Sequence, residues 1–151
     1  MKMNKEKAKV HYSHNTDHWA TPSDIYKKYM DEGYIDPCPL HCEEDNRQKM
    51  YIDKKIFINP PYSDIENWVQ FIKNNIKNNK EIHLLIPART DTNYFHELLL
   101  LKPTIIFIKG RLKFNDKGCA PFPSIIMKFN YFNIFPIYTY ETNKNLSNTK
   151  I

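Results

Sequence analysis

The sequence predicts an α/β fold whose sheet is mostly parallel and finishes in an antiparallel hairpin. Three short apolar runs are typical of buried strands, and an amphipathic helical pattern follows each of the first two; the runs span residues 56–58, 82–86 and 104–108. Strands that alternate with helices form a parallel sheet. A fourth run, 124–129, follows the third without an intervening helix, so those two strands should pair antiparallel.

Length and composition indicate one domain without a membrane span. The 151 residues suffice for a single core. We expect a flexible polar arm at 1–17, one domain at 18–140 and a polar tail at 141–151. A net charge of +5 permits a polyanionic partner but is weak evidence for one. No apolar run approaches the roughly 20 residues of a membrane span, and the first residues lack a signal peptide's apolar core, so we expect a cytoplasmic protein.

The cysteines predict free thiols. Cys38, Cys42 and Cys119 are too few and odd in number for a disulfide framework. Cys38, His41 and Cys42 could suggest a zinc site, but this spacing lacks a second ligand pair. We therefore expect no metal.

The first ordered element is a short helix. Thr21 is a favourable N-cap, Pro22 fits the first helical position, and Asp24 complements the helix dipole. Apolar side chains then recur at helical spacing until Gly33, which should end the helix. A capped helix start can also bind an anion, although capping alone would explain Thr21 and Pro22.

A short strand at 34–38 should follow and carry Asp36 to its end. An aspartate at a strand end can accept a hydrogen bond from an amine or from a ribose hydroxyl. The glycine-rich loop of dinucleotide-binding proteins is missing. A polar loop with one brief strand at 50–53 should come next, and Asp53 should be an exposed turn residue.

The stretch at 59–62 is the strongest functional candidate. Asn59, Pro60, Pro61 and Tyr62 interrupt the apolar run 56–58, at the carboxyl edge where open α/β sheets bind ligands. Prolines have no N–H, so the loop offers hydrogen-bond acceptors and few donors. It suits a planar amine whose hydrogens are accepted by the Asn59 side chain and the Pro60 carbonyl, with Tyr62 stacking on the ring. A plain tight turn is the alternative.

Two further helices complete the pattern. A capping box, Ser63 with Glu66, should begin a helix whose apolar face includes Trp68 as a core residue. The next helix should carry its apolar face around residues 94–99 and stop before Pro103. The aromatic stretch at 131–140 is a candidate edge element of the sheet.

Six motifs occur in a fixed order: W-x-T-P, D-P-C, N-P-P-Y-S, P-A-R-T-D-T, G-R-L-K-F and A-P-F-P-S-I-I. Over residues 18 to 129 this series resembles the phage-type (Dam-type) DNA N-6-adenine methyltransferase family. The resemblance implies a three-layer, Rossmann-like fold that uses S-adenosylmethionine. The stretch between Asp36 and Asn59 is shorter than in many relatives, so the sheet should be trimmed there and the pocket for the cofactor's adenosine less enclosed.

The resemblance also implies roles for individual residues. The cofactor-contacting motifs match Trp19, Thr21, Pro22, Asp36, Pro37 and Cys38. The catalytic loop matches residues 59–62. Arg111 and Lys113 lie in the G-R-x-x-F segment, and together with Arg89 they could face DNA phosphates, although a structural role is about equally plausible.

The leading hypothesis is a site-specific adenine-N6 methyltransferase that modifies double-stranded phage or prophage DNA. The same catalytic loop also serves methylation of RNA bases and of protein glutamine, and a non-catalytic nucleic-acid-binding module with this fold is a third hypothesis. We expect no separate target recognition domain, so sequence selection would come from short loops or a dimer partner, or be lax. The sequence does not distinguish a monomer from a homodimer.

Overall fold

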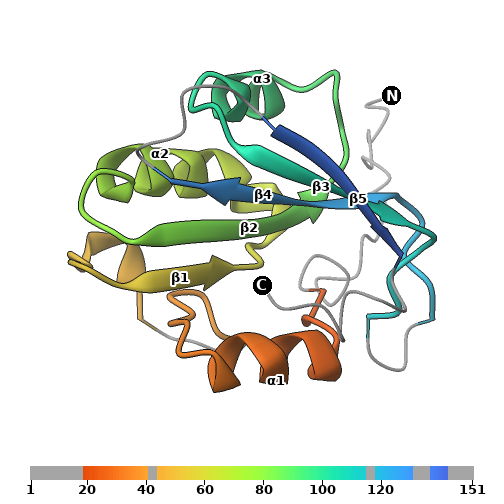
Figure 1. Ribbon diagram of the computed structural model, residues 1–151, viewed down its shortest axis with the longest axis horizontal. Coiled ribbons are helices and arrows are strands. Elements are labelled where there is room, and N and C mark those ends of the chain that lie inside the picture. Colours follow the sequence, from red (N-terminus) through yellow and green to blue (C-terminus); the bar gives the residue numbers. More distant parts are fainter. Residues whose placement is uncertain (1–18, 41–43, 115–117, 131–136, 143–151) are drawn as a thin grey trace, which may run out of the picture.

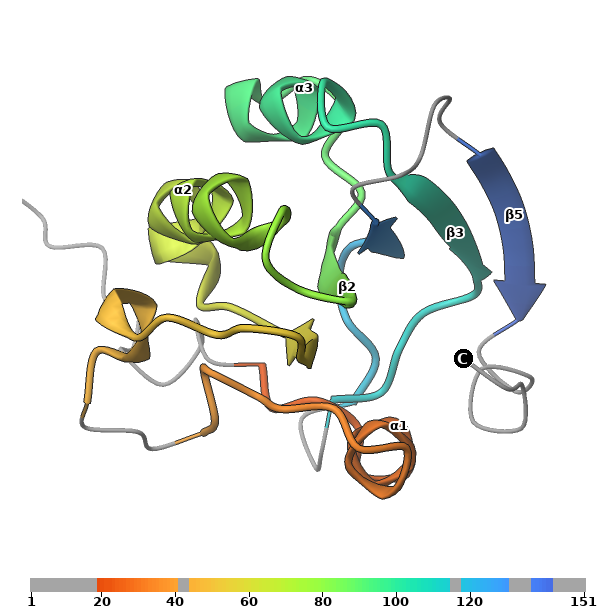
Figure 2. The ribbon, with the colours of Figure 1, turned by 60° about the vertical axis from the view of Figure 1, so that its left-hand side comes forward.

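The computed structural model describes residues 19–40, 44–114, 118–130 and 137–142. In chain order the elements are α1 (Ser23–Asp31), η1 (Asn46–Gln48), β1 (Lys55–Ile58), η2 (Tyr62–Asp64), α2 (Ile65–Asn75), β2 (Glu81–Pro87), α3 (Asn93–Leu99), β3 (Thr104–Lys109), β4 (Ser124–Phe129) and β5 (Ile137–Thr142). Helix α1 covers one face of the sheet, and α2 and α3 cover the other (Figures 1 and 2). The predicted α/β class is confirmed.

The five strands lie in the order β1-β2-β4-β3-β5. β1 pairs parallel with β2, and β3 pairs parallel with β5. β4 is antiparallel to both of its neighbours, β2 and β3. The predicted antiparallel pairing of the third and fourth runs is therefore confirmed, but β4 lies between β2 and β3 inside the sheet. Consequently β1, β2 and β3 all point the same way, and their carboxyl ends meet at one edge.

The strand expected at 34–38 is reduced to one parallel bridge between Ile35 and Ile56. The Ile35 N–H donates to the Lys55 carbonyl at 2.9 Å, and the Ile35 carbonyl accepts from the Phe57 N–H at 3.0 Å. Pro37 has no N–H with which to extend the ladder. The bridge nevertheless holds Asp36 beside the carboxyl end of β1.

The alternation of side chains along each strand separates two cores. Ile56 and Ile58 belong to the core beneath α2 and α3, whereas Phe57 points to the α1 side. There the ring of Phe57 stacks on Tyr29 of α1, with centroids 3.9 Å apart. Trp68 is 4% exposed, which confirms that it is a core residue.

Both predicted helix caps are wrong. α1 begins at Ser23 with Pro22 as its N-cap, so Thr21 lies outside the helix. α2 begins at Ile65 with Asp64 as its N-cap. Ser63 falls within η2, where the Asp64 N–H donates to the Pro61 carbonyl at 3.0 Å. That tight turn occupies the residues that a capping box at Ser63 would need.

The brief strand predicted at 50–53 is also wrong, since these residues form no strand. Asp53 has a positive φ of 54°, which ends extended structure. It is exposed, as predicted. The predicted edge element is present in part: β5 pairs with β3 and continues to Thr142, past the expected boundary at 140. The predictions for the 1–17 arm and for His41 and Cys42 fall outside the described residues.

Candidate active site

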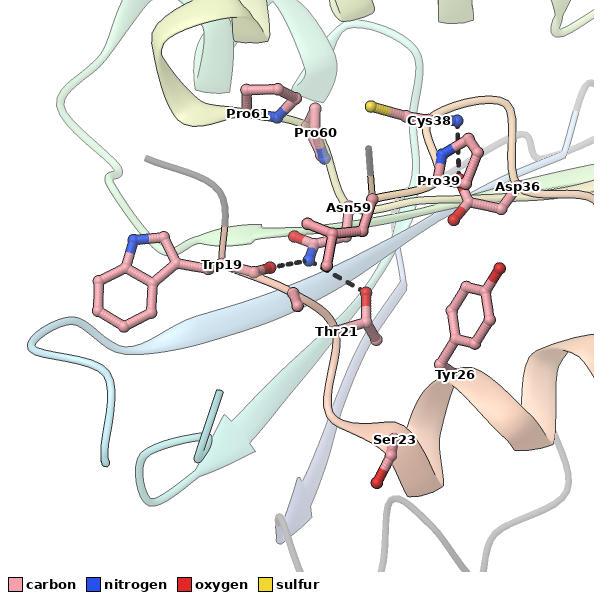
Figure 3. A pocket seen from close by; sticks show the side chains of 12 residues that line it. Trp19, Thr21, Ser23, Tyr26, Asp36, Cys38, Pro39, Asn59, Pro60 and Pro61 are labelled. Carbon is pink, nitrogen blue, oxygen red and sulfur yellow. Dashed lines mark hydrogen bonds between the residues drawn. The ribbon is translucent and has the colours of Figure 1, made fainter. Parts of the chain in front are cut away.

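A cavity of about 340 Å³ lies at the carboxyl end of β1. Its wall comes from three separate stretches of chain, which surround it in Figure 3. Seven of the predicted site residues line it: Trp19, Thr21, Asp36, Cys38, Asn59, Pro60 and Pro61. The acidic strand end and the proline loop, separated in sequence, therefore share one ligand-sized space.

The side-chain amide of Asn59 is held at its nitrogen. Nδ2 donates to the Trp19 carbonyl at 2.5 Å and to Thr21 Oγ1 at 3.0 Å (Figure 3). The carbonyl can only accept, so the NH₂ group must point toward it. Oδ1 is consequently the free end of the amide. It is buried and has no hydrogen-bond partner among the described residues.

Asp36 brings a buried carboxylate to the same cavity. Its Oδ1 accepts a hydrogen bond from the Cys38 N–H at 2.8 Å. Burial raises the pKa of Asp36 to about 6, and the bond from Cys38 opposes this only in part. Tyr26, on the first turns of α1, points toward the cavity, and its pKa is raised by burial and by the charge of Asp36.

Three of the predicted cofactor-contacting and catalytic residues lie outside this cavity. Pro22 is the N-cap of α1, and Pro37 lines an adjoining cavity of about 240 Å³. Tyr62 lies in η2, where its ring packs against Phe122. The family motifs thus include residues that form the wall of this cavity and residues that lie outside it.

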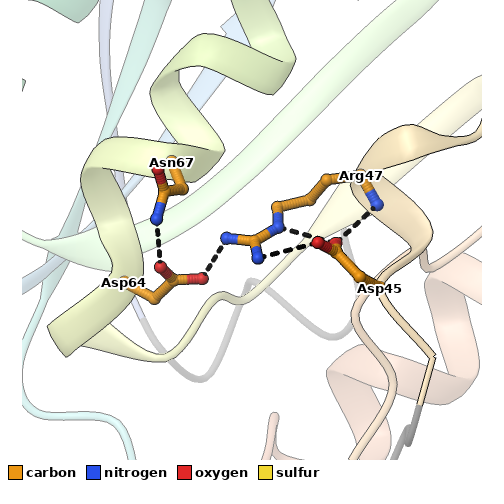
Figure 4. Close-up of polar contacts among 4 residues, drawn as sticks. All are labelled: Asp45, Arg47, Asp64 and Asn67. Atoms are coloured by element: carbon orange, nitrogen blue, oxygen red, sulfur yellow. Dashed lines mark hydrogen bonds and ion pairs between the residues drawn. The ribbon is translucent and has the colours of Figure 1, made fainter.

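The adjoining cavity shares Cys38, Pro39 and Pro61 with the first. An ion-pair cluster forms part of its wall (Figure 4). Arg47 donates from Nε to Asp45 at 2.7 Å and from a terminal nitrogen to Asp64. Its guanidinium also lies over the Trp68 ring, 5.8 Å from the centroid. These contacts fasten η1 to the turn that follows the proline loop.

The predicted phosphate-facing residues are exposed. Arg89 follows β2, and Arg111 and Lys113 follow β3. Because β1, β2 and β3 point the same way, these cations lie beyond the same edge as Asn59. This position is compatible with a role toward a ligand at that edge.

Sequence analysis missed several residues of the site. Five cavity-lining residues were not predicted: Ala20, Ser23, Tyr26, Pro39 and Leu40. By its spacing in the sequence Tyr26 belongs with the apolar residues of α1, yet only Ile25 and Tyr29 are buried in that helix. Phe122 was seen only as part of a motif. Its contacts bring together segments far apart in sequence, which a local pattern does not reveal.

The chemistry of the cavity suits a ligand that donates hydrogen bonds. The residues that line it include Asn59 and Asp36, whose side-chain oxygens accept hydrogen bonds, and its volume lies within the range of about 300–1,000 Å³ for small-molecule sites. A cofactor with an ammonium group and ribose hydroxyls fits such a set of acceptors.

Among the described residues no group of three or more His, Cys, Asp or Glu could hold a metal ion. No helix among them is long and apolar enough to span a membrane.

Comparison with known proteins agrees with this geometry. The family model described as DNA N-6-adenine-methyltransferase (Dam) matches residues 8–124. No curated protein matches the chain. The match covers most of the sequence and includes the cavity-lining residues. The chain therefore belongs to the DNA N-6-adenine-methyltransferase (Dam) family, whose reaction is methylation of adenine in DNA at N6.

Proposed function

We propose that the protein binds S-adenosylmethionine in the cavity at the end of β1 and methylates N6 of adenine in double-stranded DNA. The observation that carries this proposal is the buried Oδ1 of Asn59. It lacks a partner among the described residues and belongs to a side chain that lines the same cavity as Asp36. The family match favours adenine in DNA over RNA bases and glutamine.

The cofactor would be held by the acceptors of the cavity wall. Asp36 would accept from its ammonium or ribose groups, and Trp19, Thr21 and Cys38 would line its surroundings. When bound, S-adenosylmethionine supplies a methyl group whose carbon bonds to the amine nitrogen as the carbon–sulfur bond breaks, leaving the electron pair on sulfur and releasing one amine proton. The adjoining cavity offers room for a ligand larger than the first alone would hold.

The proline loop would orient the target amine. Asn59 Oδ1 and the Pro60 carbonyl accept the two amine hydrogens, and neither proline carries an N–H that would compete. Positive charge that develops on the nitrogen during transfer then meets acceptors already in place. Tyr62 would supply an aromatic surface for the base, which offsets part of the few kcal/mol needed to extrude it from the duplex.

The remaining features concern the DNA and the biological setting. Arg89, Arg111 and Lys113 would contact phosphates beyond the carboxyl edge. The order β1-β2-β4-β3 supports a Rossmann-like methyltransferase arrangement, trimmed between Asp36 and β1. Modification of phage or prophage DNA, in the cytoplasm, is the role that the motif series favours.

Product analysis tests the proposal. Purified protein is incubated with S-adenosylmethionine labelled in the methyl group and with adenine-containing duplex DNA, RNA or a glutamine-rich protein. The DNA is then digested to nucleosides. We expect the label in N6-methyl-2'-deoxyadenosine from the DNA. Label confined to RNA or glutamine, or none on any substrate, would refute the proposed function.

A further inference from the structure

We infer that Thr21 is a positioning residue whose hydroxyl aims the Asn59 amide, and that it is neither a helix cap nor chiefly a cofactor contact. The inference rests on the proposed function, because it assigns to Thr21 the orientation of the acceptor that receives the target amine. It also explains why a threonine precedes the proline at the start of α1 although it caps no helix.

The hydroxyl of Thr21 is not used by α1. The N-cap is Pro22, and no side chain makes a cap hydrogen bond there. Thr21 Oγ1 instead accepts from Asn59 Nδ2 at 3.0 Å, across a sequence separation of 38 residues. Thr21 is half-buried and lines the cavity beside Asn59. Its position is therefore set by the site and not by the helix.

Two acceptors fix the direction of the amide. The Trp19 carbonyl takes one Asn59 N–H at 2.5 Å, and Thr21 Oγ1 takes the other. A planar amide bonded at both N–H groups cannot pivot without breaking a bond. Its Oδ1 is then held in one direction, where it is buried and has no partner among the described residues. With Thr21 absent, the Trp19 bond alone would let the amide swing.

A fixed acceptor also selects the substrate. An amine donates to Oδ1, whereas an oxo group at the same position presents lone pairs to it and is repelled. Binding sites built to bond an N–H discriminate strongly against analogues that lack it. Thr21 thereby contributes to the choice of a 6-amino purine over a 6-oxo purine.

The first experiment compares Thr21→Val with Thr21→Ser. Valine has the shape of threonine without the acceptor, and serine keeps the hydroxyl. We expect Thr21→Val to lower kcat about tenfold, as for the loss of one hydrogen bond, with the calorimetric Kd for S-adenosylmethionine within threefold of wild type. Thr21→Ser should recover most of the lost rate. The matched control is Thr104→Val, at the amino end of β3, away from the cavity.

Two outcomes would overturn the inference. If Thr21→Val weakens cofactor binding while kcat is unchanged, Thr21 is a cofactor contact. If Thr21→Val alters the rate no more than Thr104→Val does, the hydroxyl has no role in positioning.

A second measurement does not depend on activity. The side-chain NH₂ of Asn59 is followed by ¹⁵N NMR in the wild type and both variants. We expect one of its two proton signals to shift and exchange faster in Thr21→Val, and to stay near the wild-type position in Thr21→Ser. Unchanged signals in Thr21→Val would overturn the inference. A wild-type protein that methylates no substrate would instead refute the proposed function, while these NMR shifts would still support the Thr21–Asn59 bond.

Discussion

The ring of Phe122 packs edge to face against the ring of Tyr62, with centroids 5.4 Å apart and an interplanar angle of 80°. Phe122 makes a second edge-to-face contact with Trp19, at 5.5 Å and 86°. Trp19 is the residue whose carbonyl holds the Asn59 amide. Phe122 thus links the two ends of the proposed catalytic apparatus, although it lies in the loop that leads into β4.

Removing the Phe122 ring should weaken the packing of both Tyr62 and Trp19. Phe122→Leu keeps an apolar side chain but loses both edge-to-face pairs, each worth about 0.5–1.5 kcal/mol, and a tilted pair with Phe114. We expect the free energy of unfolding to fall by about 1–3 kcal/mol in urea titrations, and the fluorescence of Trp19 to change. Phe71→Leu is the control, because Phe71 contacts Trp68 and Tyr51 in the same manner on the far face of the sheet. Methyl transfer should fall more in Phe122→Leu than in Phe71→Leu, and equal losses in both variants would argue against a special role for Phe122.

The charged form of Asp36, which we expect to bind the ligand, should also lower the stability of the fold. Its pKa of about 6 in the folded protein lies above the ordinary 3.8, so the proton binds more tightly to the folded state. The stability this provides is fully present below about pH 4 and is lost as the pH rises through 6. Asp36→Asn stays neutral, so at pH 8 it should raise the free energy of unfolding by about 3 kcal/mol at most.

Binding of S-adenosylmethionine should show the opposite trend. Because the charged carboxylate is the acceptor, calorimetric affinity should fall as the pH drops below 6, and Asp36→Asn should bind weakly at every pH. A wild-type affinity that is constant between pH 5 and 8 would exclude Asp36 from the ligand contacts.

The buried His83 should make the stability of the fold sensitive to acid, and it does not line the cavity. Tyr29 lies 3.1 Å from its Nδ1, and Glu81 lies 3.2 Å from its Nε2. Burial lowers the pKa of His83, with Lys128 contributing and the carboxylates of Glu81 and Glu32 opposing. The neutral ring satisfies both contacts by accepting from Tyr29 and donating to Glu81.

Protonation of His83 should therefore destabilise the fold. Since its pKa is lower in the folded state, its contribution to stability is present above the ordinary pKa of 6.5 and is lost as the pH falls below it. The pKa of Glu81 is lowered to about 2, chiefly by its bond to His83, so it acts in the same direction at lower pH. Thermal unfolding of the wild type and of His83→Gln between pH 4 and 8 measures this loss of stability. A wild-type stability that shows no decline below pH 6.5 relative to the variant would contradict it.

Arg47 should hold η1 without contributing much to global stability. It is 26% exposed, and such pairs are typically worth about 1 kcal/mol or less each. Arg47→Met keeps an apolar stem over Trp68 but removes the bonds to Asp45 and Asp64. We expect faster hydrogen exchange at 44–50 with little change in the free energy of unfolding. Lys49→Met removes a cation from the same segment, where its partner Glu44 is exposed, and should have a smaller effect. Equal exchange in the two variants would contradict the assigned role.

The sequence predicted what local pattern determines. Apolar runs located β1 to β4, and the prolines after Ile58 placed Asn59 at the carboxyl edge. Local pattern failed where long-range bonds compete with it. Thr21 is a good N-cap by residue type, but its hydroxyl binds Asn59. In place of the capping box expected at Ser63, the chain forms a turn closed by the hydrogen bond from the Asp64 N–H to the Pro61 carbonyl.

The site was predictable only in outline. The motif series matched Asp36 to a cofactor-contacting segment and Asn59 to the catalytic loop, and one cavity is lined by both. The role of Tyr26 depends on the nearby charge of Asp36, and that of Phe122 on its ring contact with Tyr62. Neither side chain has a sequence spacing that distinguishes it from a core aromatic.

The most direct test of the account is the rate of methyl transfer by Asn59→Ala at saturating S-adenosylmethionine, measured together with cofactor affinity. Loss of a preorganised polar group of this kind typically costs about 10²–10³ in rate. We predict a loss of at least about 100-fold with cofactor Kd within threefold of wild type, while Asn93→Ala, on the exposed start of α3, turns over normally. Methyl transfer by Asn59→Ala at a rate close to that of wild type would contradict the account.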